Sequence, residues 1–306
     1  MSQVFDVLVI GAGPGGYIAA IRAAQLGFKV ACAESNPYAD PKGEPRLGGT
    51  CLNVGCIPSK ALLASSEEFE KLGHHVADHG IKVSGISIDI KKMLDRKDQI
   101  VTKMTAGINF LFRKNKVTSL RGHASFMGKG ADGYQIKITG KDAGTVVAKN
   151  VIIATGSKAR HLPGITVDNE LVCDNEGALN FDSIPKRLGV IGAGVIGLEL
   201  GSVWRRVGAQ VTVLEALPTF LGACDEGVAK EAQKIFTKQG LDMHLGVKIE
   251  GVKADKKGVA VSYKDSAGKA QKLECDRLIV SVGRVPNTEG LNLEAIGLKT
   301  DERGFI

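Results

Sequence analysis

Two cysteines in the segment GGTCLNVGCIPSK, residues 48–60, have the clearest capacity for chemistry in this sequence. Cys51 and Cys56 are separated by four residues, which differs from the CxxC spacing of zinc ribbons and thioredoxin-like redox sites. A regular helix would place their Cα atoms beyond ~7 Å, so a disulfide requires a distorted turn, which Gly55 and Pro58 could provide. A loop that enters a helix also places thiols near the positive end of the helix dipole, which makes them reactive. The segment therefore predicts a redox-active pair in preference to two inert cysteines.

Two glycine-rich turns are the second feature with a chemical use. GAGPGG spans residues 11–16 and GAGVIG spans residues 192–197, and each follows a short apolar segment and opens a helical one. Glycines in such a turn allow a tight bend, a close approach of a pyrophosphate to the backbone, and close packing of helix and strand. An acidic residue follows the first glycine by 23 positions in both copies. The repeat predicts two dinucleotide sites, one built from Gly11, Gly13, Gly16 and Glu34 and the other from Gly192, Gly194, Gly197 and Glu215.

The surroundings of Glu215 favour one nicotinamide cofactor. A carboxylate at this position can accept hydrogen bonds from ribose hydroxyls and would repel a 2′-phosphate. The next residues, ALP at 216–218, supply no arginine to hold such a phosphate. Arg205 and Arg206 lie on the preceding helical segment and are expected to face solvent. NAD is therefore predicted in preference to NADP.

The composition is that of an ordinary globular protein and excludes several classes. The chain has 306 residues, 43% hydrophobic and 24% charged, which is enough for two folded domains. The net charge is +7, but the basic residues are spread along the chain and aromatics are 5%, so a nucleic-acid partner is not expected. No apolar run reaches ~18 residues and no basic leader opens the chain, so we expect a cytoplasmic location without membrane contact. No metal site is expected from the six histidines, and four further cysteines are expected to be buried and inert: Cys32, Cys173, Cys224 and Cys275.

The order of apolar segments predicts an α/β fold with parallel sheets. Strands are expected at 4–10, 28–33, 151–157, 187–191, 209–215 and 277–282, with shorter ones near 243–249, 258–263 and 270–274. Helices are expected after each glycine turn and at 57–75, 89–115 and about 225–240. Residues 35–50 are expected to form a loop, and residues 117–153 a small antiparallel meander.

Together the motifs resemble the pyridine nucleotide–disulfide oxidoreductase family, and the resemblance covers the whole chain. It rests on the two glycine turns, CLNVGCIPSK, ATGS at 154–157 and GRVPNT at 283–288. CLNVGCIPSK with an NAD-type acid is most similar to the members that oxidise dihydrolipoamide for the 2-oxo acid dehydrogenase complexes. The resemblance implies two Rossmann-like domains. FAD would be bound by residues 1–147 and NAD by residues 148–276, while residues 277–306 would return to an incomplete FAD domain.

The resemblance also implies roles for individual residues. Cys51 would be the interchange thiol that attacks lipoamide, and Cys56 would lie against the flavin as the charge-transfer thiolate. Lys60 would lie near flavin N5 and pair with Glu199. The flavin site would further include Thr50, Ala124, Thr155, Gly156 and Ser157, and the nicotinamide nucleotide would be bordered by Val247 and Gly283. Ordinary surface or packing roles are the alternative for Lys60, Glu199, Ala124, Val247 and Gly283.

The last residues, DERGFI, read as the start of an unpartnered strand, so a C-terminal truncation is expected. In the family, a C-terminal interface domain forms most of the homodimer contact and supplies a histidine–glutamate pair to the other subunit's dithiol site. A glycine–aspartate motif that holds FAD is also absent here. Full turnover with a lipoyl domain and the complex core is therefore not expected of this chain, only weak NADH-dependent reduction of an artificial acceptor.

Two alternatives stay open. The chain could be a nucleotide-binding or interaction fragment without turnover, or it could be another disulfide reductase of the family. Glutathione and mercuric reductases normally use NADPH, which Glu215 argues against, and soluble transhydrogenase typically lacks the cysteine pair.

Overall fold

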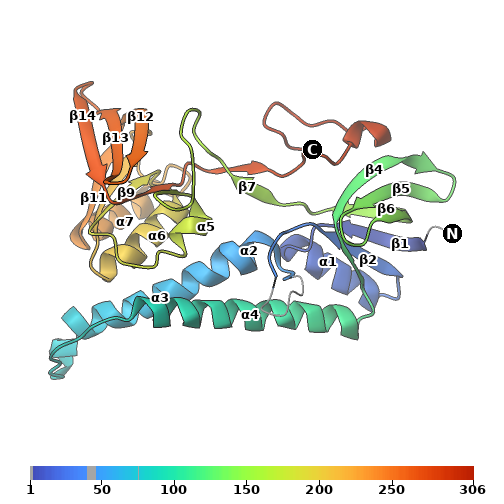
Figure 1. Ribbon diagram of the computed structural model, residues 1–306, viewed down its shortest axis with the longest axis horizontal. Coiled ribbons are helices and arrows are strands. Elements are labelled where there is room, and N and C mark those ends of the chain that lie inside the picture. The colour runs from blue at the N-terminus through green and yellow to red at the C-terminus, as the bar shows by residue number, and fades with distance from the viewer. Residues whose placement is uncertain (1–2, 40–45, 75) are drawn as a thin grey trace. The chain divides into compact units, whose positions relative to one another are not determined.

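The computed structural model describes residues 3–39, 46–74 and 76–306, and the chain divides into two compact units (Figure 1). Unit 1 consists of residues 1–57, 98–158 and 284–306, and unit 2 of residues 58–97 and 159–283. Each unit is built on a sheet with a parallel core, so the predicted α/β fold class is confirmed. Within the described ranges, no helix combines the length and apolar character that crossing a bilayer requires.

Unit 1 contains a six-stranded sheet in the order β3-β2-β1-β6-β5-β4. Its elements are β1 (Gln3–Ile10), α1 (Pro14–Gln25), β2 (Val30–Glu34), α2 (Gly49–Val54), β3 (Thr118–Arg121), β4 (His123–Gly130), β5 (Gly133–Thr139) and β6 (Gly144–Ile153). β1 pairs in parallel with both β2 and β6, and β4, β5 and β6 form the antiparallel part. The predicted meander is confirmed for β4–β6. It is wrong for β3, which joins the parallel part beside β2.

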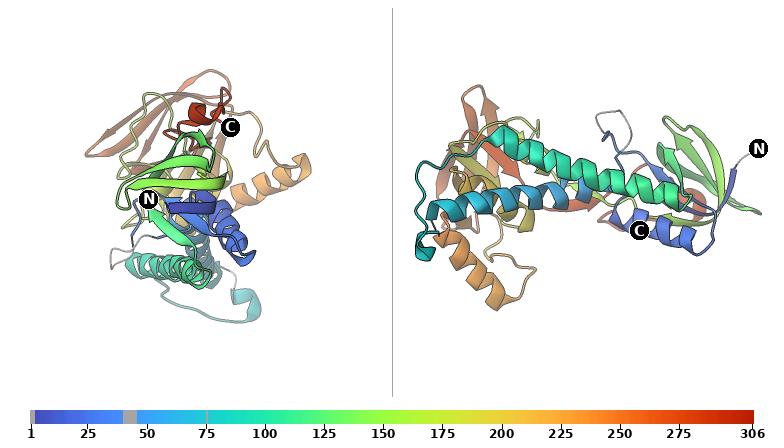
Figure 2. Two further views of the ribbon diagram at one scale, coloured as in Figure 1. Left: turned by 90° about the vertical axis from the view of Figure 1, so that its right-hand side faces the viewer. Right: turned by 90° about the horizontal axis from the view of Figure 1, so that it is seen from below.

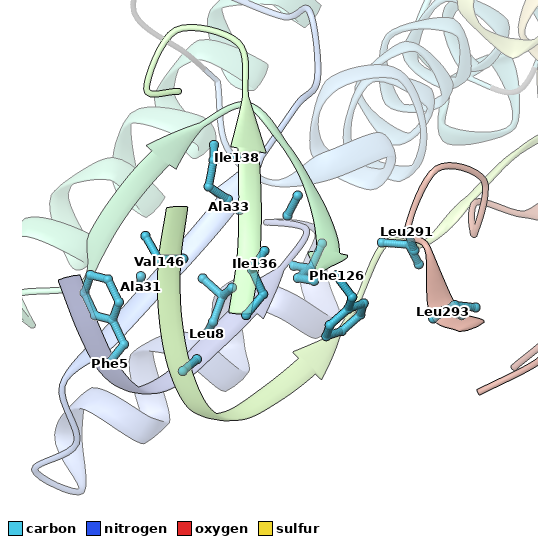
Figure 3. Close-up of a cluster of buried hydrophobic side chains, with 13 residues drawn as sticks. Phe5, Leu8, Ala31, Ala33, Phe126, Ile136, Ile138, Val146, Leu291 and Leu293 are labelled. Atoms are coloured by element: carbon cyan, nitrogen blue, oxygen red, sulfur yellow. The ribbon is translucent and has the colours of Figure 1, made fainter. Parts of the chain in front are cut away.

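The core of unit 1 lies between the parallel strands and the antiparallel strands (Figure 3). Phe5 and Leu8 of β1 are fully buried in one cluster with Phe126 of β4 and Ile136 of β5. Leu291, near the end of the chain, closes the same cluster, and its carbonyl accepts a hydrogen bond from the Phe126 N–H at 2.9 Å. Burial of these side chains stabilises the unit, since each fully buried large apolar side chain contributes about 1.5–3 kcal/mol.

Two long helices, α3 (Cys56–His74) and α4 (Ile90–Lys114), follow α2, with the 3₁₀ turn η1 (Val76–His79) between them. The Arg96 guanidinium on α4 donates to the Ala61 carbonyl at 3.0 Å and to the Ser65 hydroxyl at 3.2 Å, so these parts of the two helices lie side by side (Figure 2). Both helices match the predicted ranges closely. The predicted loop at 35–50 is confirmed for residues 35–38 and 46–48, but Gly49 and Thr50 already belong to α2, and residues 40–45 lie outside the described part of the chain.

Unit 2 contains a five-stranded parallel sheet in the order β11-β10-β9-β15-β8 and a separate antiparallel sheet, β12-β13-β14. The elements around the parallel sheet are β8 (Val172–Cys173), α5 (Asn175–Ala178), β9 (Arg187–Ile191), α6 (Val195–Arg206), β10 (Gln210–Glu215), α7 (Glu226–Lys238), β11 (Leu241–Leu245) and β15 (Arg277–Val280). The antiparallel strands are β12 (Lys248–Asp255), β13 (Gly258–Lys264) and β14 (Ala270–Cys275).

The remaining elements are short. β7 (Ser157–Ala159) pairs with β16 (Arg284–Pro286), and η2 (Leu293–Ile296) follows near the chain end.

The observed boundaries between the units differ from the predicted ones. β6 runs on to Ile153 in the sheet of unit 1, and the change of unit falls after Lys158 instead of residue 147. β15, predicted to begin the return segment, is instead the inner strand beside β9, and the return begins at Arg284. Hydrogen bonding decides these boundaries, because a strand belongs to the sheet in which its N–H and C=O groups are paired.

Candidate active site

Each glycine-rich turn joins the end of a central parallel strand to a helix. The first turn connects β1 to α1, and the second connects β9 to α6. A Cβ atom on Gly16 would lie 1.8 Å from the Gly11 carbonyl oxygen, and one on Gly197 would lie 2.2 Å from the Gly192 oxygen. Only glycine allows this close packing of helix and strand. The third glycine of each motif is therefore required by local geometry.

No side chain caps the backbone N–H groups in the first turn of α1 or α6, so these groups can donate hydrogen bonds to a ligand. Gly13 and Gly194 occupy the N-cap positions of α1 and α6, and neither helix has a side-chain cap. Uncapped N–H groups at a helix start, together with the positive end of the dipole, favour an anion such as a pyrophosphate. The residues present therefore fit one dinucleotide at each turn.

Glu34 and Glu215 each accept hydrogen bonds from the backbone of the glycine-rich turn that precedes them. Glu34 Oε2 accepts from the Ala12 N–H at 2.8 Å, and Glu215 Oε2 accepts from the Ala193 N–H at 2.7 Å. The second oxygen of each also accepts from the backbone just after it, as Glu215 Oε1 does from the Leu217 N–H at 2.8 Å. A carboxylate has about four acceptor positions, so capacity for ribose hydroxyls remains. This bracing of the glycine turn was missed in the sequence, although the constant 23-residue spacing was its signal.

The cysteine segment packs directly on the first glycine turn. The Gly48 N–H donates to the Ala12 carbonyl at 2.8 Å. A Cβ on Gly49, which has φ +58°, would lie 2.7 Å from Gly13 Cα, so only glycine permits the contact. This backbone contact places α2, which carries Thr50 and Cys51, against the start of α1.

The helix is interrupted between the two cysteines. Cys51 is half-buried in α2, which ends at Val54, and Cys56 is the exposed first residue of α3. At the break, a Cβ on Gly55 would lie 2.9 Å from the Thr50 carbonyl oxygen and 3.2 Å from Cys51 Cα. The regular helix is therefore broken at Gly55, and such a break is the kind of distorted turn that a disulfide between Cys51 and Cys56 would need.

The Glu199 carboxylate of α6 interacts with two consecutive residues of α3, Ser59 and Lys60. Lys60 Nζ lies 2.5 Å from Glu199 Oε1, and the Ser59 hydroxyl donates to Oε2 at 2.6 Å. Lys60 is largely exposed, at 59%, and Glu199 is 31% exposed, whereas Ser59 is buried. Ser59 was not singled out in the sequence, because a serine after proline carries no signal of a partner 140 residues away.

The other predicted cofactor residues lie at loops or in the core. Thr155 and Gly156 follow β6, and the Ser157 hydroxyl accepts from Arg284 Nε at 2.7 Å, which occupies part of its hydrogen-bonding capacity. The Ala124 side chain is buried in the core of unit 1, so only its backbone could contact an adenine.

In unit 2, Val247 is buried and its N–H donates to the Glu215 carbonyl at 3.0 Å, so it lies beside the second acidic residue. Gly283 has φ +107° and accepts from the Arg160 N–H at 3.0 Å.

The remaining cysteines divide into two kinds. Burial raises the pKa of the Cys32 thiol far above its usual 9.0, and raises the pKa of Cys275 to about 11 and that of Cys173 to about 12. These three stay protonated and inert at neutral pH. The expectation for Cys224 was wrong, because this residue is exposed in the loop before α7, where no sheet or helix covers it. In the described part of the chain, no cluster of three or more metal-ligating side chains is present.

Comparison with known proteins gives a consistent result. A family model described as pyridine nucleotide-disulphide oxidoreductase matches residues 5–306. The chain is 71% identical over 306 residues to a dihydrolipoyl dehydrogenase of Cupriavidus necator, covering 100% of this chain and 64% of that relative. It is 47% identical over 302 residues to the mitochondrial dihydrolipoyl dehydrogenase of Pisum sativum, covering 98% of this chain and 58% of the relative.

Among solved structures, the Cu(II) complex of the HOCl-induced flavoprotein disulfide reductase RclA from Escherichia coli is similar, with a TM-score of 0.81 at 25% identity. The match covers 99% of this chain and 62% of that one. The chain thus spans somewhat less than two thirds of the length of these relatives.

Proposed function

The chain belongs to the pyridine nucleotide-disulphide oxidoreductase family, and from this premise we propose that it carries the FAD site, the NAD site and the redox cysteines of a dihydrolipoyl dehydrogenase. The observation that carries the proposal is the backbone contact between Gly49 and Gly13. It joins the cysteine-bearing helix α2 to the first glycine turn, so that a cofactor on that turn would lie next to the cysteine segment.

Two sets of residues would hold the cofactors. Gly11, Gly13, Gly16, Glu34 and Thr50 would bind FAD, whose isoalloxazine would supply the two-electron chemistry that links a dithiol to a nicotinamide. Gly192, Gly194, Gly197, Glu215 and Val247 would bind NAD as the final acceptor. The support for both sites is the uncapped helix start and the carboxylate that braces each turn.

The cysteine pair would exchange electrons with the substrate dithiol by thiol–disulfide exchange. One substrate thiolate attacks Cys51 Sγ, the Cys51–Cys56 bond breaks, and Cys56 leaves as a thiolate. The second substrate thiolate attacks the substrate sulfur of the mixed disulfide, which closes the cyclic product and releases Cys51. The substrate is oxidised and the protein disulfide is reduced. The two substrate protons pass to the protein thiols or to water.

Lys60 would act through its charge. Its ammonium is held by Glu199 at 2.5 Å, and Glu199 is in turn oriented by Ser59. A cation fixed in this way can stabilise negative charge that develops on a nearby reacting group without reorganising during the reaction. We propose this electrostatic role for the pair.

The substrate would be dihydrolipoamide carried by a lipoyl domain, and the longer protein would serve a 2-oxo acid dehydrogenase complex as a homodimer. The support for this part is the set of relatives named dihydrolipoyl dehydrogenase, at 71% and 47% identity.

The visible absorption spectrum of the purified chain, supplied with FAD, tests the proposal. We expect a flavin band that gains a long-wavelength charge-transfer shoulder after one equivalent of dithiol under anaerobic conditions. Cys56→Ser should keep the band and lose the shoulder, whereas the matched variant Cys224→Ser, at an exposed loop cysteine, should keep both. A colourless protein, or a shoulder that persists in Cys56→Ser, would contradict the proposed site.

A further inference from the structure

The side chain of Asn53, which lies between the two cysteines on α2, forms hydrogen bonds within the cysteine segment. Its Nδ2 donates to the Gly49 carbonyl at 2.9 Å and to the Leu47 carbonyl at 3.4 Å. Gly49 is the first residue of α2, and Leu47 precedes the helix. The amide therefore links the last turn of α2 to the loop that leads into it.

The hydrogen bond from Asn53 to Gly49 closes a helical turn that has Cys51 as its middle residue. Gly49 also makes the close backbone contact with Gly13 of the first glycine turn. Gly49 is thus held from two sides, and Cys51 follows it by two residues. α2 has only 6 residues, far fewer than the ~12–15 that an isolated helix needs for stability, so contacts of this kind must fix its position.

The orientation of the Asn53 amide is determined by its neighbours. Two carbonyl oxygens accept from Nδ2, and exchanging the amide nitrogen with the amide oxygen would place oxygen against oxygen without a proton between them. The remaining atom, Oδ1, is buried and accepts no hydrogen bond from any described residue. A buried acceptor without a donor costs free energy, and a leucine of similar shape would avoid this cost. A residue that is costly in this way is typical of a functional site, which indicates that its two donor bonds have a role there.

We propose that Asn53 is a positioning residue for Cys51, an inference that rests on the proposed redox function. The two donor bonds hold α2 in the geometry from which Cys51 Sγ reaches Cys56 Sγ. Fixing one thiol beside the other raises its effective concentration, which favours the disulfide over the dithiol. The structure thereby assigns Asn53 an influence on how readily the cysteine pair is oxidised.

Exchange with glutathione makes this influence measurable. The Cys51–Cys56 bond forms while the S–S bond of glutathione disulfide breaks, so the protein dithiol is oxidised and two glutathione thiols take up the two protons. Equilibration of the purified chain in glutathione redox buffers, followed by acid quenching and quantification of free thiols, gives the equilibrium constant. All proteins in the test carry Cys224→Ser, so that this exposed thiol does not contribute.

Asn53→Leu should lower the equilibrium constant for disulfide formation about tenfold or more, because both donor bonds are lost. Asn53→Ala removes the same donors with the residue most favourable to a helix and should give a similar decrease, so the test does not depend on the folding of one variant. Asn53→Ser should give an intermediate constant, because a helical serine hydroxyl can donate to the carbonyl four residues earlier, which here is that of Gly49.

Asn115→Leu is the matched control. The Asn115 amide donates to the Leu111 carbonyl at 2.8 Å with the same four-residue spacing, but at the exposed end of α4. Its loss should leave the equilibrium constant unchanged. Urea unfolding of the reduced proteins separates positioning from stability, since a purely structural role of Asn53 would lower the midpoint of Asn53→Leu and leave its equilibrium constant unchanged.

Two outcomes would overturn the proposal alone. They are a normal disulfide whose equilibrium constant is the same in Asn53→Leu, Asn53→Ala and the parent, and an equal decrease in Asn115→Leu. Failure of the parent to form the Cys51–Cys56 disulfide at all would overturn this proposal together with the proposed redox function. The two proposals therefore fail in different ways.

Discussion

The Ser59 hydroxyl donates a hydrogen bond of 2.6 Å to Glu199 Oε2, while Lys60 binds the other oxygen of the same carboxylate. Two neighbouring residues of α3 thereby hold one side chain of α6. Ser59 is buried and Lys60 is largely exposed, so the serine anchors the carboxylate from the protein side and leaves the lysine accessible. This arrangement makes Ser59 a positioning residue for the Lys60–Glu199 pair.

Ser59→Ala should therefore lower the free energy of unfolding by about 1–2 kcal/mol, because a buried hydrogen bond to a charged group is lost. Urea unfolding measures the loss, and a double-mutant cycle with Glu199→Gln isolates the coupling between the two residues. Ser183→Ala is the matched control, since Ser183 donates to Asp182 at 3.0 Å on the exposed surface and should change stability little. Additive effects of Ser59→Ala and Glu199→Gln would contradict the interpretation.

Gly55→Ala should slow formation of the Cys51–Cys56 disulfide. The new methyl group would lie 2.9 Å from the Thr50 carbonyl oxygen and 3.2 Å from Cys51 Cα, so the turn must open. Quantification of free thiols during oxidation of the reduced protein measures the rate. Gly15→Ala is the control, because that glycine lies in α1 with nothing within 4 Å of the added methyl group. Equal oxidation rates in the two variants would show that the turn at Gly55 does not set the cysteine geometry.

Glu215→Gln should weaken NADH binding about tenfold or more, equivalent to about 1.4 kcal/mol or more. The amide can accept through only one oxygen, so one of the Ala193 and Leu217 N–H groups would face another donor. Fluorescence titration with NADH measures the affinity. Glu231→Gln, which breaks only an exposed ion pair with Lys234 on α7, should leave it unchanged. An unchanged affinity in Glu215→Gln would remove this carboxylate from the proposed NAD site.

Thiol labelling should divide the cysteines by burial. In the reduced protein, Cys56 and Cys224 are exposed and should react with iodoacetamide within minutes at neutral pH. Cys32, Cys173 and Cys275 are buried, and burial raises the pKa of each thiol, so they should react only after denaturation. Mass spectrometry of digested samples identifies the labelled residues. Rapid labelling of Cys275 in the folded protein would contradict its position in the core of unit 2.

The free energy of unfolding should decrease at alkaline pH, because burial raises the pKa of the Cys275 thiol. The Cys275 pKa is raised from 9.0 to about 11, so above pH 9 the unfolded chain loses a proton that the folded chain keeps. The contribution of this thiol is fully present below pH 9 and decreases between pH 9 and 11 by about 1.4 kcal/mol per pH unit. Denaturant unfolding at several pH values should show a shallower decline in Cys275→Ala than in Cys224→Ala, whose exposed thiol is the control. Equal decreases of stability with pH in the two variants would contradict a raised pKa of Cys275.

Local features of this protein were predictable from the sequence because they depend on residues close together in the chain. The glycine turns are of this kind, since Gly16 packs on the carbonyl of Gly11 only five residues away. The fold class and most helix and strand positions also followed, because periodic burial sets them. The boundaries between the two units did not follow, since they fall after Lys158 and Gly283 instead of residues 147 and 276. A short apolar segment reads the same in either sheet until its pairing partner is known.

The sequence by itself therefore determined which residues form each turn, each helix and the redox segment. Tertiary structure alone decided which distant groups meet. Gly49 reaches Gly13 and Ser59 reaches Glu199 only after the strands and helices pack. The burial of Ser202 on α6 without a hydrogen-bond partner among the described residues has the same origin, because burial and hydrogen bonding of one side chain depend on every neighbouring element. Local spacing encodes local geometry, whereas contacts between distant residues arise from packing the whole chain into its least exposed arrangement.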